Sequence, residues 1–291
     1  MSARIQAFFD QATSTVSYLV SDPATMAAAI IDPVLDYEPR GATISTVSAD
    51  RILAAMSDQG LHLRYVLETH AHADHLTAAR LIRTRTGAPV VIGSHIGEVQ
   101  KTFIPRFEAF DVIPDGSAFD RLAADGDVLA LGDLAIRVMH TPGHTAACVT
   151  YVIGDAAFVG DTLFMPDYGT ARTDFPGGDA ADLYRSIRRI LDLPSATRIY
   201  VGHDYLPEGR TQPRWETDVA EQRASNIHIH DGVDETAFVA LRQARDATLP
   251  PPLLILPSLQ VNIRAGVLPP PSAHGGVFLR LPVTGAEQLS A

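Results

Sequence analysis

The sequence contains a single cysteine, Cys148, among its 291 residues. One cysteine excludes an intramolecular disulfide framework and any zinc or iron–sulfur site built from several cysteines. This composition suits a reducing compartment, and we expect a cytoplasmic protein. Because Cys148 lies in the apolar segment AACVTYV, we expect a buried structural thiol rather than a reactive one.

Long apolar runs and basic patches are also missing. No segment approaches the roughly 20 apolar residues that a membrane span needs. The first 20 residues include Asp10 and lack the continuous apolar stretch of a secretory signal. The formal net charge is -11, and no dense run of Lys or Arg occurs. We therefore expect no nucleic-acid or membrane partner, and we expect small molecules as ligands.

What the sequence does have is an ordinary globular composition, with 46% hydrophobic residues. Short apolar runs closed by Asp and Pro indicate strands at the start of the chain, and strands then alternate with helices, which favours an α/β fold. A second group of strands is expected between residues 127 and 164. The residues with helical spacing and end signals are 48–60, 74–87, 179–194, 215–226 and 234–247.

The domain organisation follows from two further absences. The length permits one large domain or two small ones, but there is no internal repeat and no obvious linker. We therefore predict one domain over residues 1–291. Its Pro-rich end, from about residue 250 to 291, is predicted to be an extended tail packed on the body.

A cluster of metal-capable side chains occurs in the segment T-H-A-H-A-D-H-L, residues 69–76. It contains His70, His72, Asp74 and His75, at the junction of a predicted strand and a predicted helix. In extended backbone His70 and His72 would project to one side, so that both imidazoles could face one ion. Asp74 and His75 would then turn toward a neighbouring second position. Capping or solvated residues are the alternative, but histidine is uncommon.

Three more candidate ligands follow apolar strands further along the chain. His144 lies in H-T-P-G-H-T, Asp161 closes V-G-D-T, and His203 lies in V-G-H-D. Each alone is more often a turn residue or a satisfied polar contact. Together they repeat one pattern, a ligand-type residue just past the end of a strand.

This set of residues resembles the complete ligand set of the metallo-β-lactamase superfamily, over roughly residues 5 to 210. The resemblance implies an αββα sandwich, in which two mixed β-sheets pack face to face with helices outside. It also implies a metal site at one edge of the sheets.

The reaction is indicated by other segments: D-Y-G-T-A-R-T-D-F-P-G-G-D, V-G-H-D-Y and the late L-Q-V-N-I-R-A-G. These resemble the persulfide dioxygenases, the sulfur dioxygenases of the ethylmalonic-encephalopathy protein type. That resemblance implies one Fe(II) per chain held by His72, His144 and Asp161, a facial triad with open positions for substrate and O2. The expected reaction converts glutathione persulfide, or a similar low-molecular-weight persulfide, with O2 and water to sulfite and thiol.

The same resemblance implies supporting roles for the remaining residues. His70, Asp74, His75 and His203 would orient ligands, hold waters or form a second metal site. Arg172 would hold the pocket or a glutathione carboxylate, or else form a salt bridge with Asp174. Tyr205 would donate a hydrogen bond to substrate, or else pack in the core. Zinc can replace iron in such a site, and a homodimer is common among similar enzymes.

Two other functions stay open at this point. The first is a dinuclear zinc hydrolase of thioesters, as in glyoxalase II, or of lactones or β-lactams. The helical C-terminal domain and basic glutathione-binding cluster of glyoxalase II are not evident in this sequence, which disfavours it. The second is a non-catalytic metal-binding or sulfide-sensing component, which an intact open metal site disfavours.

Overall fold

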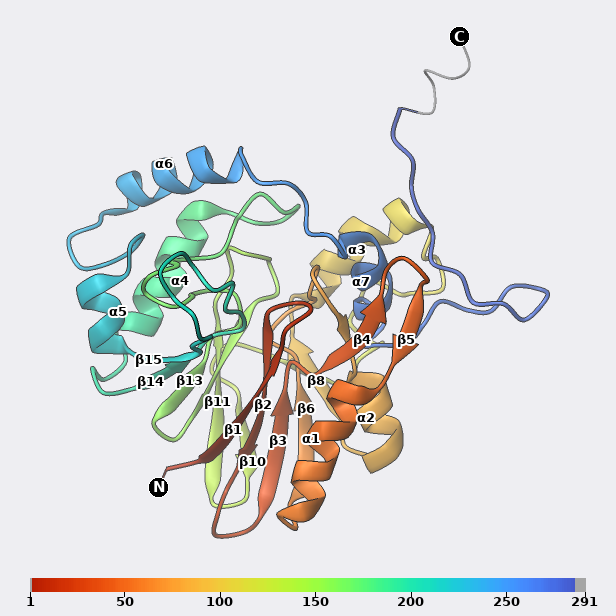
Figure 1. Ribbon diagram of the computed structural model, residues 1–291, viewed down its shortest axis with the longest axis horizontal. Helices are drawn as coiled ribbons and strands as arrows, with labels where there is room; N and C mark the ends of the chain where they lie inside the picture. Colours follow the sequence, from red (N-terminus) through yellow and green to blue (C-terminus); the bar gives the residue numbers. More distant parts are fainter. Residues whose placement is uncertain (1, 286–291) are drawn as a thin grey trace.

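Two six-stranded sheets lie face to face in the computed structural model, which describes residues 2–285 (Figure 1). The first has the order β1-β2-β3-β6-β8-β9, antiparallel from β1 to β3 and parallel from β3 to β9. Its strands are β1 (Arg4–Asp10), β2 (Thr15–Ser21), β3 (Ala27–Ile31), β6 (His62–Leu67), β8 (Val90–Gly93) and β9 (Arg121–Ala123).

The second sheet runs from β10 to β15 in chain order and is also mixed, because only β13 and β14 pair in parallel. Its strands are β10 (Val128–Leu131), β11 (Leu134–His140), β12 (Val149–Ile153), β13 (Ala156–Phe158), β14 (Arg198–Tyr200) and β15 (Glu216–Asp218). A small third sheet joins β5 (Thr43–Ser45), β4 (Val34–Glu38) and β7 (Leu76–Thr77).

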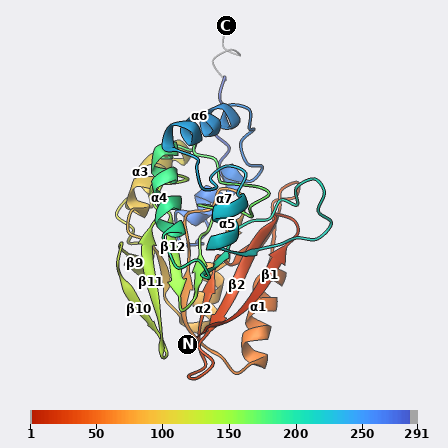
Figure 2. The same ribbon diagram turned by 90° about the vertical axis from the view of Figure 1, so that its left-hand side faces the viewer.

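Helices cover the outer faces of both sheets (Figures 1 and 2). On the first sheet these are α1 (Val47–Asp58), α2 (Ala79–Thr86) and α3 (Ile96–Phe107). On the second they are α4 (Ala180–Leu191), α5 (Val219–Ser225) and α6 (Glu235–Asp246). A last helix, α7 (Ile255–Asn262), packs beside β7 and α3.

The buried residues form three separate clusters, one for each gap between layers. Alternation along β2 shows why: Tyr18 and Val20 point into the space between the sheets, whereas Leu19 points out toward the helices. Three apolar clusters therefore separate four layers, two of helices on the outside and two of sheets between them. The αββα arrangement expected from the sequence is therefore confirmed.

A helix lies in each expected range, but two begin later than expected, because residues 76–77 form β7 and residues 216–218 form β15. One helix carries its expected cap. Asp179 accepts a hydrogen bond from the backbone N–H of Asp182 at 2.8 Å and starts α4. Helix α3 was not expected from the sequence. Pro105 lies inside it, and the helix ends two residues later.

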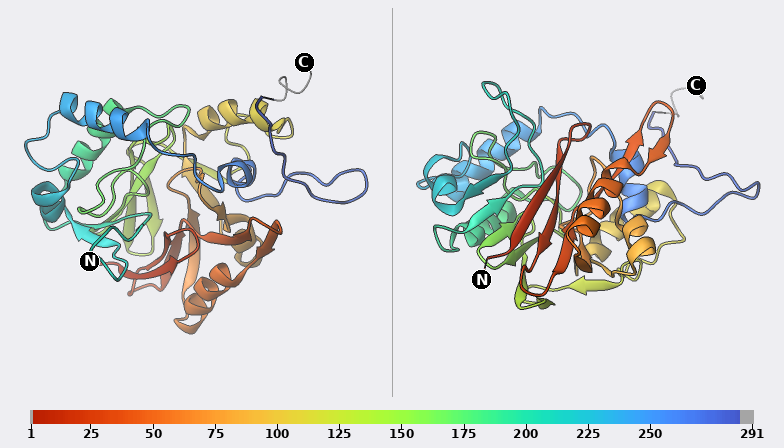
Figure 3. Two further views of the ribbon diagram at one scale, coloured as in Figure 1. Left: turned by 45° about the horizontal axis from the view of Figure 1, so that its top comes forward. Right: turned by 60° about the horizontal axis from the view of Figure 1, so that its bottom comes forward.

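The C-terminal tail differs from the prediction of an extended segment, because residues 255–262 form α7. Pro257 is the third helical residue, where a backbone N–H has no intrahelical partner, so proline does not disrupt the helix. After α7 the chain leaves the body as an exposed arm, drawn in blue in Figure 3. The last part of the predicted tail, residues 286–291, lies outside the described residues. Among residues 2–285, no helix is both long and apolar enough to cross a membrane.

Candidate metal centre

The candidate ligands gather at one edge of the two sheets, because each follows the end of a strand. The segment from His70 to His75 follows β6 in the first sheet. In the second sheet His144 follows β11, Asp161 follows β13 and His203 follows β14. Strands that end at a common edge bring together residues 133 positions apart, from His70 to His203.

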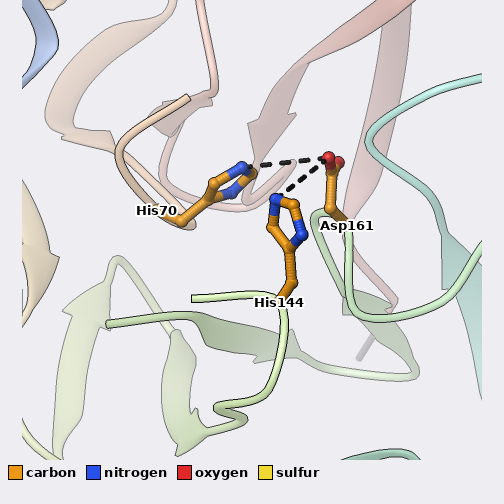
Figure 4. Close-up of side chains that lie close together, drawn as sticks. All are labelled: His70, His144 and Asp161. Atoms are coloured by element: carbon orange, nitrogen blue, oxygen red, sulfur yellow. Dashed lines mark ion pairs between the residues drawn. The ribbon is translucent and has the colours of Figure 1, made fainter. Parts of the chain in front are cut away.

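One group consists of His70, His144 and Asp161 (Figure 4). The Nε2 atoms of His70 and His144 lie 3.9 and 3.7 Å from Asp161 Oδ2. These separations are too long for hydrogen bonds. They suit three ligands around one ion, each bound at about 2.0–2.2 Å.

Neighbouring atoms fix the tautomers of these histidines. The Thr69 hydroxyl donates its one hydrogen to Asp32 at 2.8 Å, so it accepts from His70 Nδ1–H at 3.0 Å. His144 Nδ1 donates to the Arg172 carbonyl oxygen at 2.8 Å. In both rings Nε2 therefore keeps its lone pair and can bind a metal.

The residues present fit a metal ion, since several buried polar atoms have no hydrogen-bond partner among residues 2–285. Such orphaned atoms are costly unless something else binds them. They belong to the candidate ligands: His70 Nε2, His72 Nδ1 and Nε2, His75 Nε2, His203 Nδ1 and Nε2, Asp74 Oδ2 and Asp161 Oδ1.

In the structure His72 does not group with His144 and Asp161, and His70 lies where the sequence had led us to expect His72. Its Nε2 lies 3.1 Å from Asp32 Oδ1 and 3.3 Å from Glu68 Oε2, in a fully buried ion-pair cluster. The family resemblance had implied His72 as a ligand, and extended backbone would have turned both His70 and His72 toward one ion. Strand β6 ends at Leu67 and the following residues form bends, so the alternation of side chains is lost.

A second group lies beside the first and consists of His72, Asp74 and His203. His203 Nε2 lies 3.2 Å from Asp74 Oδ2 and 3.3 Å from Asp161 Oδ1, so it touches both groups. The ring of His75 lies 4.2 Å from that of His72 and 6.3 Å from that of His203. All seven candidate ligands are thus brought to one place.

The electrostatics separate His72 from the other histidines. Burial lowers the pKa of His70 well below its usual value and that of His75 to about 4. Both are neutral near pH 7, as ligands must be. Burial acts in the same direction on His72, but Asp32 and Glu68 outweigh it and raise the pKa of His72 well above its usual value.

Three supporting residues were not found from the sequence. Asp32 accepts from both the backbone N–H and the hydroxyl of Thr69, at 2.7 and 2.8 Å. Glu68 accepts from Thr77. Asn262, from α7, donates to the carbonyl oxygens of His72 and His75, each at 2.8 Å. Asp32 directly follows β3 and Glu68 directly follows β6, and a carboxylate right after an apolar strand is a signal that could have marked them.

A cavity of about 600 Å³ opens beside the metal centre, within the usual range for small-molecule sites. Asp74, His144 and Asp161 line it together with aromatic and proline side chains. Tyr205 also lines it, stacked on His203 with ring centroids 5.2 Å apart and 40% exposed. It is placed to meet a ligand rather than to pack in the core.

Arg172 lines the cavity but is already engaged. It binds both oxygens of Asp174 at 2.6 Å and donates to the carbonyls of Pro250 and Leu249. Of the two roles considered from the sequence, the salt bridge is the one seen. Cys148 is buried, and burial raises the pKa of its thiol to about 12.

Comparison with known proteins places this geometry in context. The family profile described as metallo-beta-lactamase superfamily matches residues 11–203. A probable metallo-hydrolase of Burkholderia pseudomallei is 53% identical over 96% of this chain and 98% of its own length. A beta-lactamase hydrolase-like protein of Xylella fastidiosa is 52% identical over 98% of this chain, which spans only 65% of that protein.

Two further similar proteins are both named ETHE1. The human mitochondrial persulfide dioxygenase ETHE1 is 32% identical over 91% of this chain and 90% of its own length. The solved structure of ETHE1 from Myxococcus xanthus is 33% identical, has a TM-score of 0.72, and covers 92% of this chain and 100% of the other.

Proposed function

Because the chain belongs to the metallo-beta-lactamase superfamily, we propose that it is an iron(II)-dependent persulfide dioxygenase. Its substrate is glutathione persulfide or a similar low-molecular-weight persulfide. The reaction is GSSH + O2 + H2O → GSH + SO3²⁻ + 2H⁺. The sulfur–sulfur bond breaks, the terminal sulfur is oxidised, and O2 is reduced.

The observation that carries this proposal is the group of His70, His144 and Asp161. Two imidazoles and one carboxylate on one face are the ligand set of non-haem iron oxygenases, and they leave positions free for small ligands. His72 pairs with Asp32 and Glu68 and does not join this group. This also supports the proposal, because a fourth ligand would close one of the positions left for substrate and O2. The similarity to two proteins named ETHE1, which covers 91% and 92% of this chain, points the same way.

Ferrous iron in this group would supply activation of O2, which redox-inert zinc cannot. The protein's own residues prepare the site. Thr69 and the Arg172 carbonyl hold the two imidazoles in the metal-binding tautomer. Phe175, edge-on to His144 at 5.2 Å, and Tyr205, stacked on His203, pack against the ligand rings and help to hold their orientation.

A zinc hydrolase is the second candidate, and one observation favours it. The group of His72, Asp74 and His203 lies beside the first and could hold a second ion. Two bridged metals and a bound hydroxide would suit attack on a thioester or lactone carbonyl. The relative named a probable metallo-hydrolase is consistent with this reading.

Oxygen uptake separates the two functions. Protein loaded with iron under anaerobic conditions is given glutathione persulfide, with metal content measured on the same sample. We expect rapid O2 consumption, one sulfite per O2 and about one iron per chain. Two zinc ions per chain with thioester hydrolysis, and no O2 uptake from the iron form, would contradict the proposal.

Two variants test which histidine binds the iron. His70→Ala removes a ligand of the single group, so we expect loss of most bound iron and at least a hundredfold drop in O2 uptake. His72→Ala leaves that group intact and is expected to keep close to one iron per chain. It should instead lower the free energy of unfolding by about 3 kcal/mol, since two buried carboxylates lose their cation. The reverse pattern of iron content would restore the triad with His72.

A further inference from the structure

Three arginines line the cavity beside the metal centre: Arg172, Arg242 and Arg245. Arginine is the side chain best suited to bind a carboxylate, because its guanidinium matches the two oxygens. It can do so only if its donors are not already used. The hydrogen bonds of the three arginines therefore decide which one is available to a ligand.

Two of the three are engaged within the protein. Arg172 binds Asp174 and two carbonyls of the segment after α6. Arg242 is 1% exposed; it binds Asp246 at 2.6 Å and the carbonyl oxygen of Thr170 at 2.9 Å. Both act as internal braces of the cavity wall.

Arg245 differs from both. It lies three residues after Arg242 on α6, so the two side chains share a face of the helix. Its side chain is exposed and lines the cavity. Within residues 2–285 it forms no ion pair, in contrast to Arg172 and Arg242.

A continuous wall joins Arg245 to the metal centre. Burial raises the pKa of the Tyr168 hydroxyl, and the nearby positive charge of Arg245 opposes that rise. The ring of Tyr168 lies 5.2 Å from that of Tyr205, and Tyr205 stacks on His203 at 5.2 Å. Metal ligands at one part of the cavity and, at another, an arginine without a carboxylate partner among residues 2–285 suit a ligand with a sulfur at one end and an anion further along.

We propose that Arg245 binds a carboxylate of the thiol substrate and so selects carboxylate-bearing persulfides, such as that of glutathione, over uncharged ones. This inference rests on the proposed function for the sulfur chemistry. It assigns to Arg245 the contact that the sequence alone had suggested for Arg172.

Equilibrium binding tests the contact without turnover. Glutathione and its dimethyl ester are titrated into metal-loaded protein under anaerobic conditions, and binding is followed by calorimetry. The wild-type protein should bind glutathione at least tenfold more tightly than the ester. In Arg245→Gln the affinity for glutathione should fall at least tenfold, to that of the ester, whereas the affinity for the ester should not change.

Two further variants provide the controls. Arg245→Lys keeps the charge and should recover part of the lost affinity. Arg51→Gln removes an exposed arginine on α1, outside this cavity, and should bind both ligands as the wild type does. The metal content and Tm of each variant show whether its site is intact.

The proposal is overturned if Arg245→Gln binds glutathione as tightly as the wild type, or if the wild type does not distinguish glutathione from its ester. A different result would show that the proposed function, and not the Arg245 contact, is wrong. In that result the protein takes up no O2 with glutathione persulfide but still binds glutathione more tightly than its ester. Arg245 would then recognise a glutathione conjugate in another reaction.

Discussion

Single residues at the metal centre act through the hydrogen bonds of their neighbours. Asp32 is the clearest case, because it binds the backbone and hydroxyl of Thr69 and also pairs with His72. It thereby orients one histidine toward the metal and holds the next one away. The role of each histidine here is therefore determined by the groups that bind it, such as this carboxylate, and not by its being a histidine.

His228 is a residue whose protonation state should govern stability. It is buried, its Nδ1 accepts from the backbone N–H of Thr170 at 3.1 Å, and burial, assisted by Arg242 and Arg245, lowers its pKa to about 4. A lowered histidine pKa means that the unfolded state binds the proton more readily. Stability is therefore full above about pH 6.5 and falls as the pH drops toward 4, by about 1–2 kcal/mol from this residue after allowance for solvent screening.

Urea unfolding at pH 7.5 and pH 5 measures this effect. The loss of stability between the two pH values should be smaller in His228→Gln than in the wild type. His62→Gln, which changes an exposed histidine, is the control and should behave as the wild type does. Equal losses in all three proteins would show that His228 does not carry the pH dependence.

At the scale of elements, α7 acts as a clamp on the metal-binding loop. Asn262, its last residue, donates to the carbonyls of His72 and His75 and accepts from the backbone N–H of Thr77 at 2.9 Å. These bonds join segments about 190 residues apart. The helix thus fixes the backbone on which the ligands sit.

Asn262→Asp tests the clamp, because it keeps the acceptor oxygen and replaces the donor group with a second oxygen. We expect a roughly tenfold to hundredfold loss of iron affinity, the usual range for groups that support metal ligands. The matched control is Gln260→Ala, also on α7, whose side chain binds the arm at Arg280 instead of the loop. Unchanged iron affinity in Asn262→Asp would contradict the clamp.

The sequence predicted the elements better than it predicted the contacts between them. Apolar strands followed by Pro-Gly or Gly-Asp turns indicated that His144 and Asp161 lie at strand ends. The choice between His70 and His72 depended on the backbone after Leu67, which no side-chain pattern reveals. The role of Asn262 depends on a contact across most of the chain. Likewise the Pro-rich end of the chain suggested an extended tail, whereas burial against the body favours a helix over residues 255–262.

For the whole molecule, the metal is expected to contribute to stability as well as to chemistry. The orphaned atoms of His70, His75 and Asp161 are buried without hydrogen-bond partners within the described chain, and an ion relieves that cost. Ligand at about 1,000 times its Kd adds roughly 4 kcal/mol. That corresponds to a rise in Tm of about 10 °C for a domain of this size.

Thermal unfolding with and without metal measures this contribution. Iron or zinc should raise the Tm of the chelator-treated protein, and His144→Ala should abolish most of that increase. An identical Tm in chelator and in metal would mean that the cluster holds no ion under these conditions.

The three apolar clusters lie between the layers, whereas every candidate ligand sits on a loop at their edge. Mutations that alter the chemistry therefore need not disturb the packing that keeps the layers together. Over evolutionary time such a scaffold can exchange one reaction for another by drift in a few edge loops. Because Arg245 is exposed and lies outside the three apolar clusters, the proposed selectivity for the thiol can diverge before the metal centre does.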